Sequence, residues 1–448
     1  ELDPKFASAH NNLGMVQAAT GQLGDAIASF RRAQSAGRAS LHSNLVYYLH
    51  FHPDYDAAAI LAELKKWDRT HAAPLAGQIP RHRKPVAADA GKRLKIGYVS
   101  PNLCAHVIGR NILPLLREHD KTQFEIFAYS THFHDDAMTE VLRSHVNHWR
   151  PAAFSRDEQI AGMIADDGID ILVDLSLHLA QNRLLVFARK PAPIQVTFAG
   201  YPGGTGLATM DYRLTDPYLD PEGSDCFYTE RSIRLPHSFW CYDRQGMELD
   251  GSPTVNSLPA LETGRITFGC LNHVTKLTDA SLKLWRKVLD AVPGSRMILL
   301  ASSQSHRESL TAALEGRAEF SAVLPREEYL EKYNRIDIAL DTFPYNGHTT
   351  SLDAYWMGVP VVTRVGRTVV GRAGWSQLSN LNLTELSAQS DEEFERIASS
   401  LAADLPRLGK LRGSLRDRMQ ASPLMDAPGF ARGIEAAYRQ MWRSWISQ

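Results

Sequence analysis

Short runs of β-branched and aromatic residues alternate with amphipathic segments along most of the chain. In the first half, the runs "LKIGYVS" (94–100), "FEIFAYS" (124–130) and "IDILVDLS" (169–176) are separated by segments with helical spacing, and "IQVTFAG" (194–200) and "DYRLTD" (211–216) follow them. Runs of this length and composition indicate strands. The alternation predicts an α/β domain with a largely parallel sheet.

A second alternation of the same kind follows the segment "DGSPTVNSLPALETG". Its candidate strands are 266–272, 295–302, 320–324, 336–342 and 359–364, with helical segments between them. The tail "GFARGIEAAYRQMWRSWISQ" has the spacing of an amphipathic helix, so Trp442 and Trp445 are expected to be buried. Two successive doubly wound domains predict a ligand cleft at the carboxyl ends of their strands.

The first segment has the spacing of a helical repeat instead. In "HNNLGMVQAATGQLGDAIASFRRAQSAGR", the positions that match one tetratricopeptide repeat are Leu13, Gly14, Gly21, Ala26, Phe30 and Ala33. An ordinary helical hairpin is the alternative. A lone repeat cannot bury its apolar faces, and the chain lacks an initiator Met, so we expect a fragment of a longer protein with further repeats upstream.

These patterns predict six segments. They are a repeat and helical lead-in (1–75), a Pro- and basic-rich linker (76–92), a first Rossmann-like lobe (93–250), a linker (251–264), a second Rossmann-like lobe (265–420) and a C-terminal helix (421–448).

Composition narrows the possible partners. The 448 residues contain 49 Lys and Arg against 50 Asp and Glu, so no basic field exists to attract nucleic acid. No apolar run is long enough to span a membrane, and no membrane partner is expected. The four cysteines are scattered without C-x-x-C pairing, which favours a reducing, cytoplasmic location.

The stretch "YNGHTTSLDAYWMG" (345–358) suggests a nucleotide site. Free backbone N–H groups at the start of a helix, beside the hydroxyls of Thr349 and Thr350, can hold phosphate. Gly347 would let the backbone approach a ligand, and Asp353, one turn further, could accept hydrogen bonds from a ribose. The alternative is plain helix capping by Thr349 and a surface charge at Asp353.

Lys276 and two histidines follow other predicted strands. Lys276, in "CLNHVTKLTD", could neutralise a diphosphate leaving group without metal, although it could also be a solvated lysine at a helix start. His106 and His178 could act as acid or base near neutral pH, or serve as hydrogen-bonding loop residues. The glycines of "FAGYPGGTG" (198–206) could leave peptide N–H groups open to a sugar or phosphate.

Motifs of several other enzyme classes are missing. The sequence has no H-E-x-x-H, Walker A or G-x-S-x-G motif. Its one D-x-D, Asp54 to Asp56, lies in the helical lead-in, where a solvated surface pair is expected. No metal site is therefore expected.

Together these motifs resemble those of a known family. The chain is similar to the O-linked N-acetylglucosamine transferases and their bacterial homologues in glycosyltransferase family 41. The similar stretches are the repeat, "KIGYVSPNLCAHVIGRN", "LPHSFWCYD", "FGCLNHVTKLTD", "DTFPYNGHTTSLDAYWMGVPVVT" and "PLMDAPGFARGIEAAYRQMW". The resemblance implies a GT-B fold of two Rossmann-like domains and inverting transfer of N-acetylglucosamine from UDP-GlcNAc to Ser or Thr of proteins, with acceptors in the repeat groove and no metal or other cofactor.

The resemblance also implies roles for individual residues. Lys276 would stabilise the departing UDP, with His348, Thr349 and Thr350 at the diphosphate and Asp353 at the ribose. The further nucleotide contacts it implies are His273, Leu324, Arg326 and Tyr329. On the other lobe, His106 would lie at the sugar as a possible base, and the implied sugar contacts are His178, Gly200, Tyr201 and Pro202.

Three departures from the family pattern leave alternatives open. Asn102 stands where the family commonly has Asp, Leu177 where Gly is usual, and Gly204 where Thr is common. All three fall in the sugar and acceptor lobe. A related enzyme with another donor, such as GDP-fucose or a glucose donor, and a nucleotide-binding repeat scaffold with little activity are therefore the alternatives.

Overall fold

The computed structural model describes residues 6–82, 90–244, 253–301 and 303–447. The chain folds into two compact units, each assembled from separate stretches of sequence. Unit 1 comprises Glu1–Ser35, Tyr48–Asp56 and Glu248–Leu424, and unit 2 comprises Ala36–Tyr47, Ala57–Met247 and Met425–Gln448. The contiguous segments expected from the sequence stay predictions, and both expected linkers lie partly outside the described residues.

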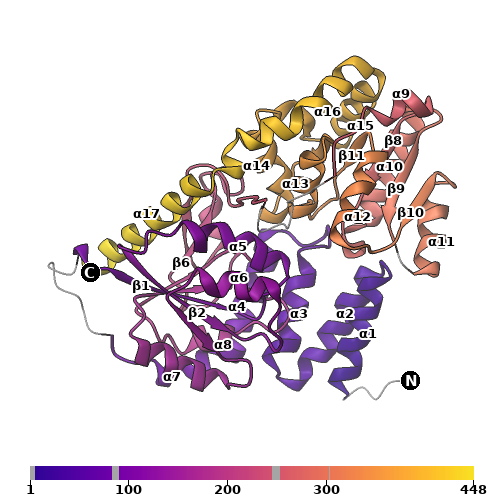
Figure 1. Ribbon diagram of the computed structural model, residues 1–448. Coiled ribbons are helices and arrows are strands. Elements are labelled where there is room, and N and C mark those ends of the chain that lie inside the picture. Colours follow the sequence, from indigo (N-terminus) through magenta and orange to yellow (C-terminus); the bar gives the residue numbers. More distant parts are fainter. Residues whose placement is uncertain (1–5, 83–89, 245–252, 302, 448) are drawn as a thin grey trace. The chain divides into compact units, whose positions relative to one another are not determined.

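Unit 2 contains a seven-stranded parallel sheet in the order β3-β2-β1-β4-β5-β6-β7 (Figure 1). Central strands buried on both faces are almost wholly apolar, as where Ile96 of β1 pairs with Ile126 and Ile171 on either side. The strands are β1 (Leu94–Ser100), β2 (Phe124–Ser130), β3 (His148–Pro151), β4 (Ile171–Asp174), β5 (Ile194–Thr197), β6 (Tyr212–Thr215) and β7 (Arg231–Arg234).

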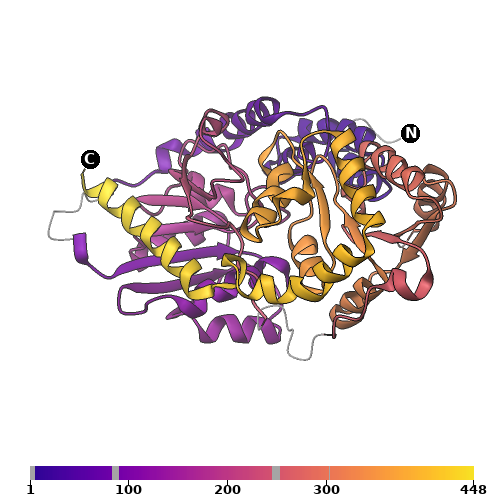
Figure 2. The same cartoon turned by 90° about the horizontal axis from the view of Figure 1, so that it is seen from above.

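The helices of unit 2 come from all three of its stretches of sequence. They are α3 (Ala39–Leu49, which belongs to this unit as far as Tyr47), α4 (Ala57–Trp67), α5 (Val107–Glu118), α6 (Ala137–Ser144), α7 (Asp157–Asp167), α8 (Leu184–Ala188) and α17 (Ala427–Ile446). The longest, α17, is the tail helix expected from the sequence (Figure 2). Its Trp442 is buried, whereas Trp445 is only half-buried.

A buried polar network joins α17 to the sheet of unit 2. The His119 ring lies 2.8 Å from the Tyr98 hydroxyl through Nε2 and 2.9 Å from the Glu435 carboxylate through Nδ1. The hydroxyls of Tyr98 and Tyr438 lie 3.1 Å apart. Burial lowers the pKa of His119, although Glu435 opposes the shift. Because unpartnered polar groups are costly in a core, these mutual bonds fix where the helix lies.

Unit 1 contains a six-stranded parallel sheet in the order β10-β9-β8-β11-β12-β13. Its strands are β8 (Thr267–Cys270), β9 (Arg296–Leu300), β10 (Ala318–Ser321), β11 (Ile338–Leu340), β12 (Val361–Arg364) and β13 (Ser387–Ala388). Its helices in this part are α9 (Pro259–Thr263), α10 (Asp279–Ala291), α11 (Gln304–Ala313), α12 (Arg326–Glu331), α13 (Thr349–Trp356), α14 (Ala373–Asn380), α15 (Asp391–Ala403) and α16 (Leu405–Gln420).

The N-terminal stretch of unit 1 is a helical hairpin of α1 (Ala7–Ala19) and α2 (Leu23–Ala33). Gly14 allows the two helices to approach, because a Cβ there would lie 2.7 Å from the buried Phe30 ring. The hairpin expected from the repeat spacing is thus present, and its assignment as a tetratricopeptide repeat stays a prediction. The next helix, α3 (Ala39–Leu49), leads into the short Tyr48–Asp56 stretch of unit 1.

Both sheets share one topological feature. The strand order reverses between β1 and β4 in unit 2, and between β8 and β11 in unit 1. Ligands of open parallel sheets bind at such switch points, beyond the carboxyl ends of the strands. The segments that follow these four strands are therefore where the chemistry of each unit is expected.

Candidate functional site

Lys276 follows β8, on one side of the switch point of unit 1. Its ammonium Nζ donates a hydrogen bond of 2.7 Å to the backbone carbonyl of Asn346 and lies 4.2 Å from the ring centroid of Tyr345. Burial lowers the pKa of Lys276 to about 8, while the nearby Asp341 carboxylate opposes the shift. Lys276 is held in place, so the alternative of a solvated lysine is wrong.

The loop that receives Lys276 follows β11, on the other side of the same switch point. Its shape depends on Asp341, whose buried carboxylate accepts hydrogen bonds from the Gly347 amide (2.6 Å), the Thr342 amide (2.8 Å) and the Thr363 hydroxyl (2.7 Å). Burial raises the pKa of Asp341 to about 6. The sequence reasoning missed Asp341, although its place directly after a buried strand was a usable signal.

Packing within the loop requires the glycine at position 347. A Cβ at this position would overlap the Ser351 hydroxyl and lie 3.2 Å from the Asp341 carboxylate. The expectation that Gly347 also lets a ligand approach the backbone stays a prediction.

His348, Thr349 and Thr350 lie at the start of α13. His348 occupies the N-cap position without a side-chain capping bond, so the alternative in which Thr349 caps the helix is wrong. Burial, reinforced by the charge of Lys276, holds the pKa of His348 well below its usual value. Thr349 and Thr350 open the first turn, where backbone N–H groups have no intrahelical acceptor.

Arg326 and Asp353 form a bidentate ion pair, with nitrogen to oxygen distances of 2.8 and 2.5 Å. The Asp353 carboxylate is buried, so a ribose would share it with Arg326. The Arg326 guanidinium lies 5.5 Å from the ring centroid of Tyr329. Tyr333 connects this cluster to the helix start, because its hydroxyl lies 2.9 Å from the Tyr329 hydroxyl and donates to the Thr350 carbonyl at 3.0 Å.

Two further predicted contacts lie at the edges of this region. His273 is exposed, and its Nδ1 accepts a hydrogen bond of 3.4 Å from the Thr275 amide. Desolvation and the charge of Lys276 lower its pKa. Leu324 is half-buried and lies between β10 and α12.

An aromatic stack lies behind Lys276. The centroid of the Tyr345 ring lies 4.5 Å from that of Phe51, with the two rings nearly parallel, and 4.8 Å from that of His348. Phe51 comes from the Tyr48–Asp56 stretch. Its ring also contacts that of Tyr48, and the Tyr48 ring stacks on Phe30 of α2. The helical lead-in therefore supplies part of the support for the Lys276 site, which the sequence reasoning did not detect.

In unit 2, His106 follows β1 and caps α5. Its Nδ1 accepts a hydrogen bond of 3.2 Å from the Ile108 amide. Burial and the charges of Arg110 and His132 lower its pKa. A neutral imidazole whose Nδ1 accepts carries its proton on Nε2, so His106 presents an N–H donor in this geometry.

His178 follows β4 and is fully buried. Its Nδ1 lies 3.1 Å from the Ser43 hydroxyl, and its Nε2 lies 2.8 Å from the Thr205 carbonyl. The Trp67 ring packs edge-on against it at 5.2 Å. Both ring nitrogens are therefore engaged within unit 2, which makes His178 a positioning residue for the loop that contains Thr205.

The loop after β5 contains Gly200, Tyr201 and Pro202. Tyr201 is buried, and its ring lies 5.5 Å from that of Tyr47. Gly200 packs closely, since a Cβ there would lie 2.9 Å from the Leu175 carbonyl. These three residues and His178 belong to neighbouring segments at the carboxyl edge of the sheet.

The glycines that follow serve packing rather than an open binding surface. A Cβ at Gly204 would lie 2.8 Å from the Glu230 carboxylate. The same carboxylate accepts hydrogen bonds from the amides of Thr205 (2.5 Å) and Gly206 (3.1 Å). The expectation that glycine N–H groups of this loop stay open is wrong for Gly206.

Neither a metal-binding cluster nor a membrane-spanning helix occurs among the described residues. Within residues 6–82, 90–244, 253–301 and 303–447, no group of three or more His, Cys, Asp and Glu side chains is arranged to hold a metal ion. Over the same ranges, no helix combines the length and the apolar character needed to cross a bilayer.

Known proteins resemble this chain over most of its length. Residues 42–250 and 254–434 match the sequence pattern of Glycosyl transferase family 41. A relative in Arabidopsis thaliana, named probable UDP-N-acetylglucosamine–peptide N-acetylglucosaminyltransferase SPINDLY, is 37% identical over 371 residues, which are 80% of this chain and 40% of the relative. The protein with the same enzyme name and the designation SEC, also from Arabidopsis thaliana, is 30% identical over 80% of this chain and 38% of its own.

Solved structures also resemble this chain. A mutant of the O-GlcNAc transferase of Thermobaculum terrenum superposes with a TM-score of 0.91 and 39% identity, over 99% of this chain and 86% of that one. The sucrose-phosphate synthase of Thermosynechococcus elongatus, at 12% identity and a TM-score of 0.53 over 79% of this chain and all of its own, shares the fold alone.

The expected GT-B fold of two Rossmann-like domains is confirmed by these matches and by the two parallel sheets. The chain spans about 40% of the length of the curated relatives it matches. Because a single family pattern covers nearly all of the chain, it belongs to glycosyl transferase family 41.

Proposed function

We propose that the chain transfers N-acetylglucosamine from UDP-GlcNAc to Ser or Thr hydroxyls of polypeptides, with inversion at the anomeric carbon. Support comes from the names of the two curated relatives described above, both of which are probable UDP-GlcNAc–peptide transferases. The chemistry of the residues in each unit supports the same function.

The observation that supports this function most strongly is the setting of Lys276. A half-buried ammonium donates a hydrogen bond to the carbonyl of Asn346, two residues before the N-cap of α13. A leaving diphosphate develops negative charge, which a fixed cation and free backbone N–H groups stabilise more strongly than water does. Thr349 and Thr350 would add hydroxyl donors, and His348, being neutral, would contribute a hydrogen bond.

The nucleoside would bind at the cluster formed by Arg326, Asp353, Tyr329 and Tyr333. Tyr329 would pack against the uracil ring, beside Leu324 and His273, while the Arg326–Asp353 pair would present a carboxylate oxygen to the ribose hydroxyls. Because the Arg326 guanidinium already fixes the Asp353 carboxylate, ribose binding would lose less conformational entropy than it would with a mobile carboxylate.

The sugar and the acceptor would meet the residues of unit 2. Gly200, Tyr201 and Pro202 would line the sugar, with His178 holding the adjacent loop through Thr205. His106 would donate its Nε2–H to a sugar or acceptor oxygen. The acceptor polypeptide would be held along the helical repeat surface while its hydroxyl attacks in line with the departing diphosphate.

Substitution of Lys276 tests the proposal directly. Lys276→Ala is expected to lower transfer from UDP-GlcNAc by about 10³-fold while UDP still binds, because the lost charge acts mainly on the developing leaving group. Transfer would be followed with radiolabelled donor and a lysate as acceptor, and UDP binding by calorimetry. Transfer by Lys276→Ala at the wild-type rate would contradict the proposed role.

The donor is tested on the wild-type chain. UDP is expected to raise the melting temperature more than GDP does, since the nucleotide that binds the folded state more tightly stabilises it more. A larger shift with GDP, together with transfer from GDP-fucose, would replace the proposed donor.

A further inference from the structure

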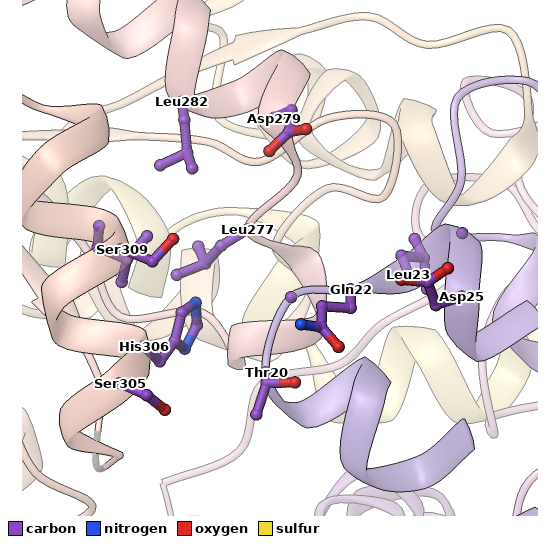
Figure 3. A pocket seen from close by; sticks show the side chains of 13 residues that line it. Thr20, Gln22, Leu23, Asp25, Leu277, Asp279, Leu282, Ser305, His306 and Ser309 are labelled. Carbon is purple, nitrogen blue, oxygen red and sulfur yellow. The ribbon is translucent and has the colours of Figure 1, made fainter. Parts of the chain in front are cut away.

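A pocket of about 520 Å³ opens within unit 1, beside the turn of the α1–α2 hairpin (Figure 3). One wall is the turn itself, residues 20–25, and the other walls are the starts of α10 and α11. We call it the hairpin pocket. It involves none of the residues assigned above to the nucleotide or the sugar.

His306 of α11 is directed into the hairpin pocket (Figure 3). Its side chain is 5% exposed, yet no hydrogen-bond partner for either ring nitrogen occurs among the described residues. Burial lowers its pKa, which favours the neutral ring with one donor and one acceptor. Buried polar groups nearly always have partners, and those of His306 can come only from what occupies the pocket, water or a ligand.

The remaining lining combines apolar and acidic groups. Leu277, Leu282 and Leu310 provide apolar surface, while Asp25 of α2 and Asp279 of α10 supply two exposed carboxylates. Neither carboxylate forms an ion pair with the described residues. Lysine and arginine side chains match this combination, because their aliphatic stems pack on apolar groups while their charged ends seek carboxylates.

The hairpin pocket lies next to the chain segment that contains the proposed leaving-group lysine. Leu277, in its lining, directly follows Lys276 in sequence. A smaller pocket of about 140 Å³, lined in part by His52, Thr275 and Leu277, adjoins it. An extended polypeptide advances about 3.3 Å per residue, so an acceptor bound beside Lys276 covers about 10 Å of the surrounding surface with three residues.

We propose that the hairpin pocket binds a basic side chain of the acceptor polypeptide, within a few residues of the modified Ser or Thr. The inference rests on the proposed function and adds a substrate preference to it. Asp25 and Asp279 would hold the cation, the leucines its stem, and His306 a donor or acceptor of the adjacent peptide backbone.

Matched peptides test the preference. We would synthesise short peptides with a single Ser and one Arg at successive positions on either side of it, and counterparts in which citrulline replaces Arg. Citrulline keeps the shape and loses the charge. At the best position, kcat/KM for the Arg peptide is expected to exceed that for the citrulline peptide about five- to tenfold, mainly through KM.

Variants then locate the preference. The double variant Asp25→Asn with Asp279→Asn is expected to bring the Arg to citrulline ratio close to one, and His306→Phe, which fills the pocket, is expected to raise KM for both peptides. Asp417→Asn, an exposed carboxylate on α16 outside the hairpin pocket, is the control and should keep the wild-type ratio.

Binding without turnover separates this inference from the proposed function. Fluorescence anisotropy of a labelled Arg peptide with the full chain and UDP should weaken about five- to tenfold in the double variant and remain unchanged in Asp417→Asn. If peptides bind with this pattern but no sugar is transferred, the pocket assignment stands and the proposed function fails. Equal binding of Arg and citrulline peptides, or no effect of the double variant, would overturn the assignment.

Discussion

Lys276 can stabilise a leaving diphosphate only while its ammonium keeps its proton. Burial lowers the pKa of Lys276 to about 8, so the free protein loses this charge as the pH rises through that value. We therefore expect kcat/KM for the donor to fall above about pH 8. The corresponding fall in kcat should occur at higher pH, because the charge of a bound diphosphate raises the pKa of Lys276.

A pH series on two proteins checks this expectation. Lys276→Arg carries a guanidinium that does not titrate in this range, so the alkaline fall should disappear even though the rate is lower. A wild-type profile that stays level to about pH 10 would show that the proton on Lys276 is not required.

His106 gives a second prediction at the scale of one residue. Its Nδ1 already accepts from the Ile108 amide, so we expect it to act as a hydrogen-bond donor and not as the base. His106→Gln, which keeps an N–H donor, should retain most of the transfer rate, whereas His106→Ala should lose about 10- to 100-fold. If His106 is the base, both variants should lose the same activity, and the fall of the wild-type rate at low pH should disappear in both.

The residue scale also shows where sequence reasoning reaches its limit. Lys276, Thr349 and Asp353 could be singled out from the sequence. Each is a polar residue that follows a predicted strand or lies at the start of the next helix, where parallel sheets bind ligands. Asp341 gave one signal, its place directly after a buried strand, but its contact with the Gly347 amide is visible only in the structure. Phe51 gave no signal, since its importance lies in packing on Tyr345, which is distant in the sequence. From its type alone, His178 could be an acid, a base or a hydrogen-bonding loop residue, and only the structure shows that both of its ring nitrogens are engaged.

At the scale of elements, the aromatic stack makes the helical lead-in part of the support for Lys276, and so of the proposed donor site. Phe51→Ala would remove the ring packed on Tyr345, and a buried Phe lost from a core costs about 3–5 kcal/mol of unfolding free energy. We expect weaker UDP binding and a lower transfer rate as well, because Tyr345 contacts Lys276.

Denaturant unfolding and UDP calorimetry would measure these effects. Phe6→Ala is the matched control, since Phe6 is 58% exposed and its loss should change stability by less than about 0.5 kcal/mol. If Phe51→Ala leaves UDP affinity at the wild-type value, the lead-in contributes to stability but not to the donor site.

The elements that sequence patterns detect are the ones buried on both faces. β1 and β2 were predicted with their observed bounds, because continuous apolar runs leave little ambiguity. β3, with the sequence "HWRP", and β7, with "RSIR", lie at the two edges of their sheet and were missed. Edge strands face solvent and carry charged residues, so they lack the pattern by which strands are found.

At the scale of the whole molecule, the end of the chain belongs to the unit that begins near residue 36. Tyr438 of α17 is fully buried in unit 2 and bonds to Tyr98 of β1. Tyr438→Ala is expected to cost about 3–5 kcal/mol. The loss should appear as faster hydrogen exchange in β1 and β2, whereas β8 and β11 of unit 1 should keep their protection.

Hydrogen exchange with peptide resolution provides the measurement. Arg432→Ala, on an exposed position of the same helix, is the control and should leave exchange in both sheets unchanged. Faster exchange confined to unit 1 would contradict the assignment of α17 to unit 2.

The interleaving of the two units has a consequence for engineering. Unit 1 needs Glu1–Ser35 and Tyr48–Asp56 as well as its long Glu248–Leu424 stretch, and unit 2 needs the tail. A chimera could import the Glu248–Leu424 stretch from a relative with another donor. Phe51 of this chain would then have to pack against the relative's residue in place of Tyr345. Exchange of donor specificity between family members should therefore succeed only when the short N-terminal stretches travel with the long one.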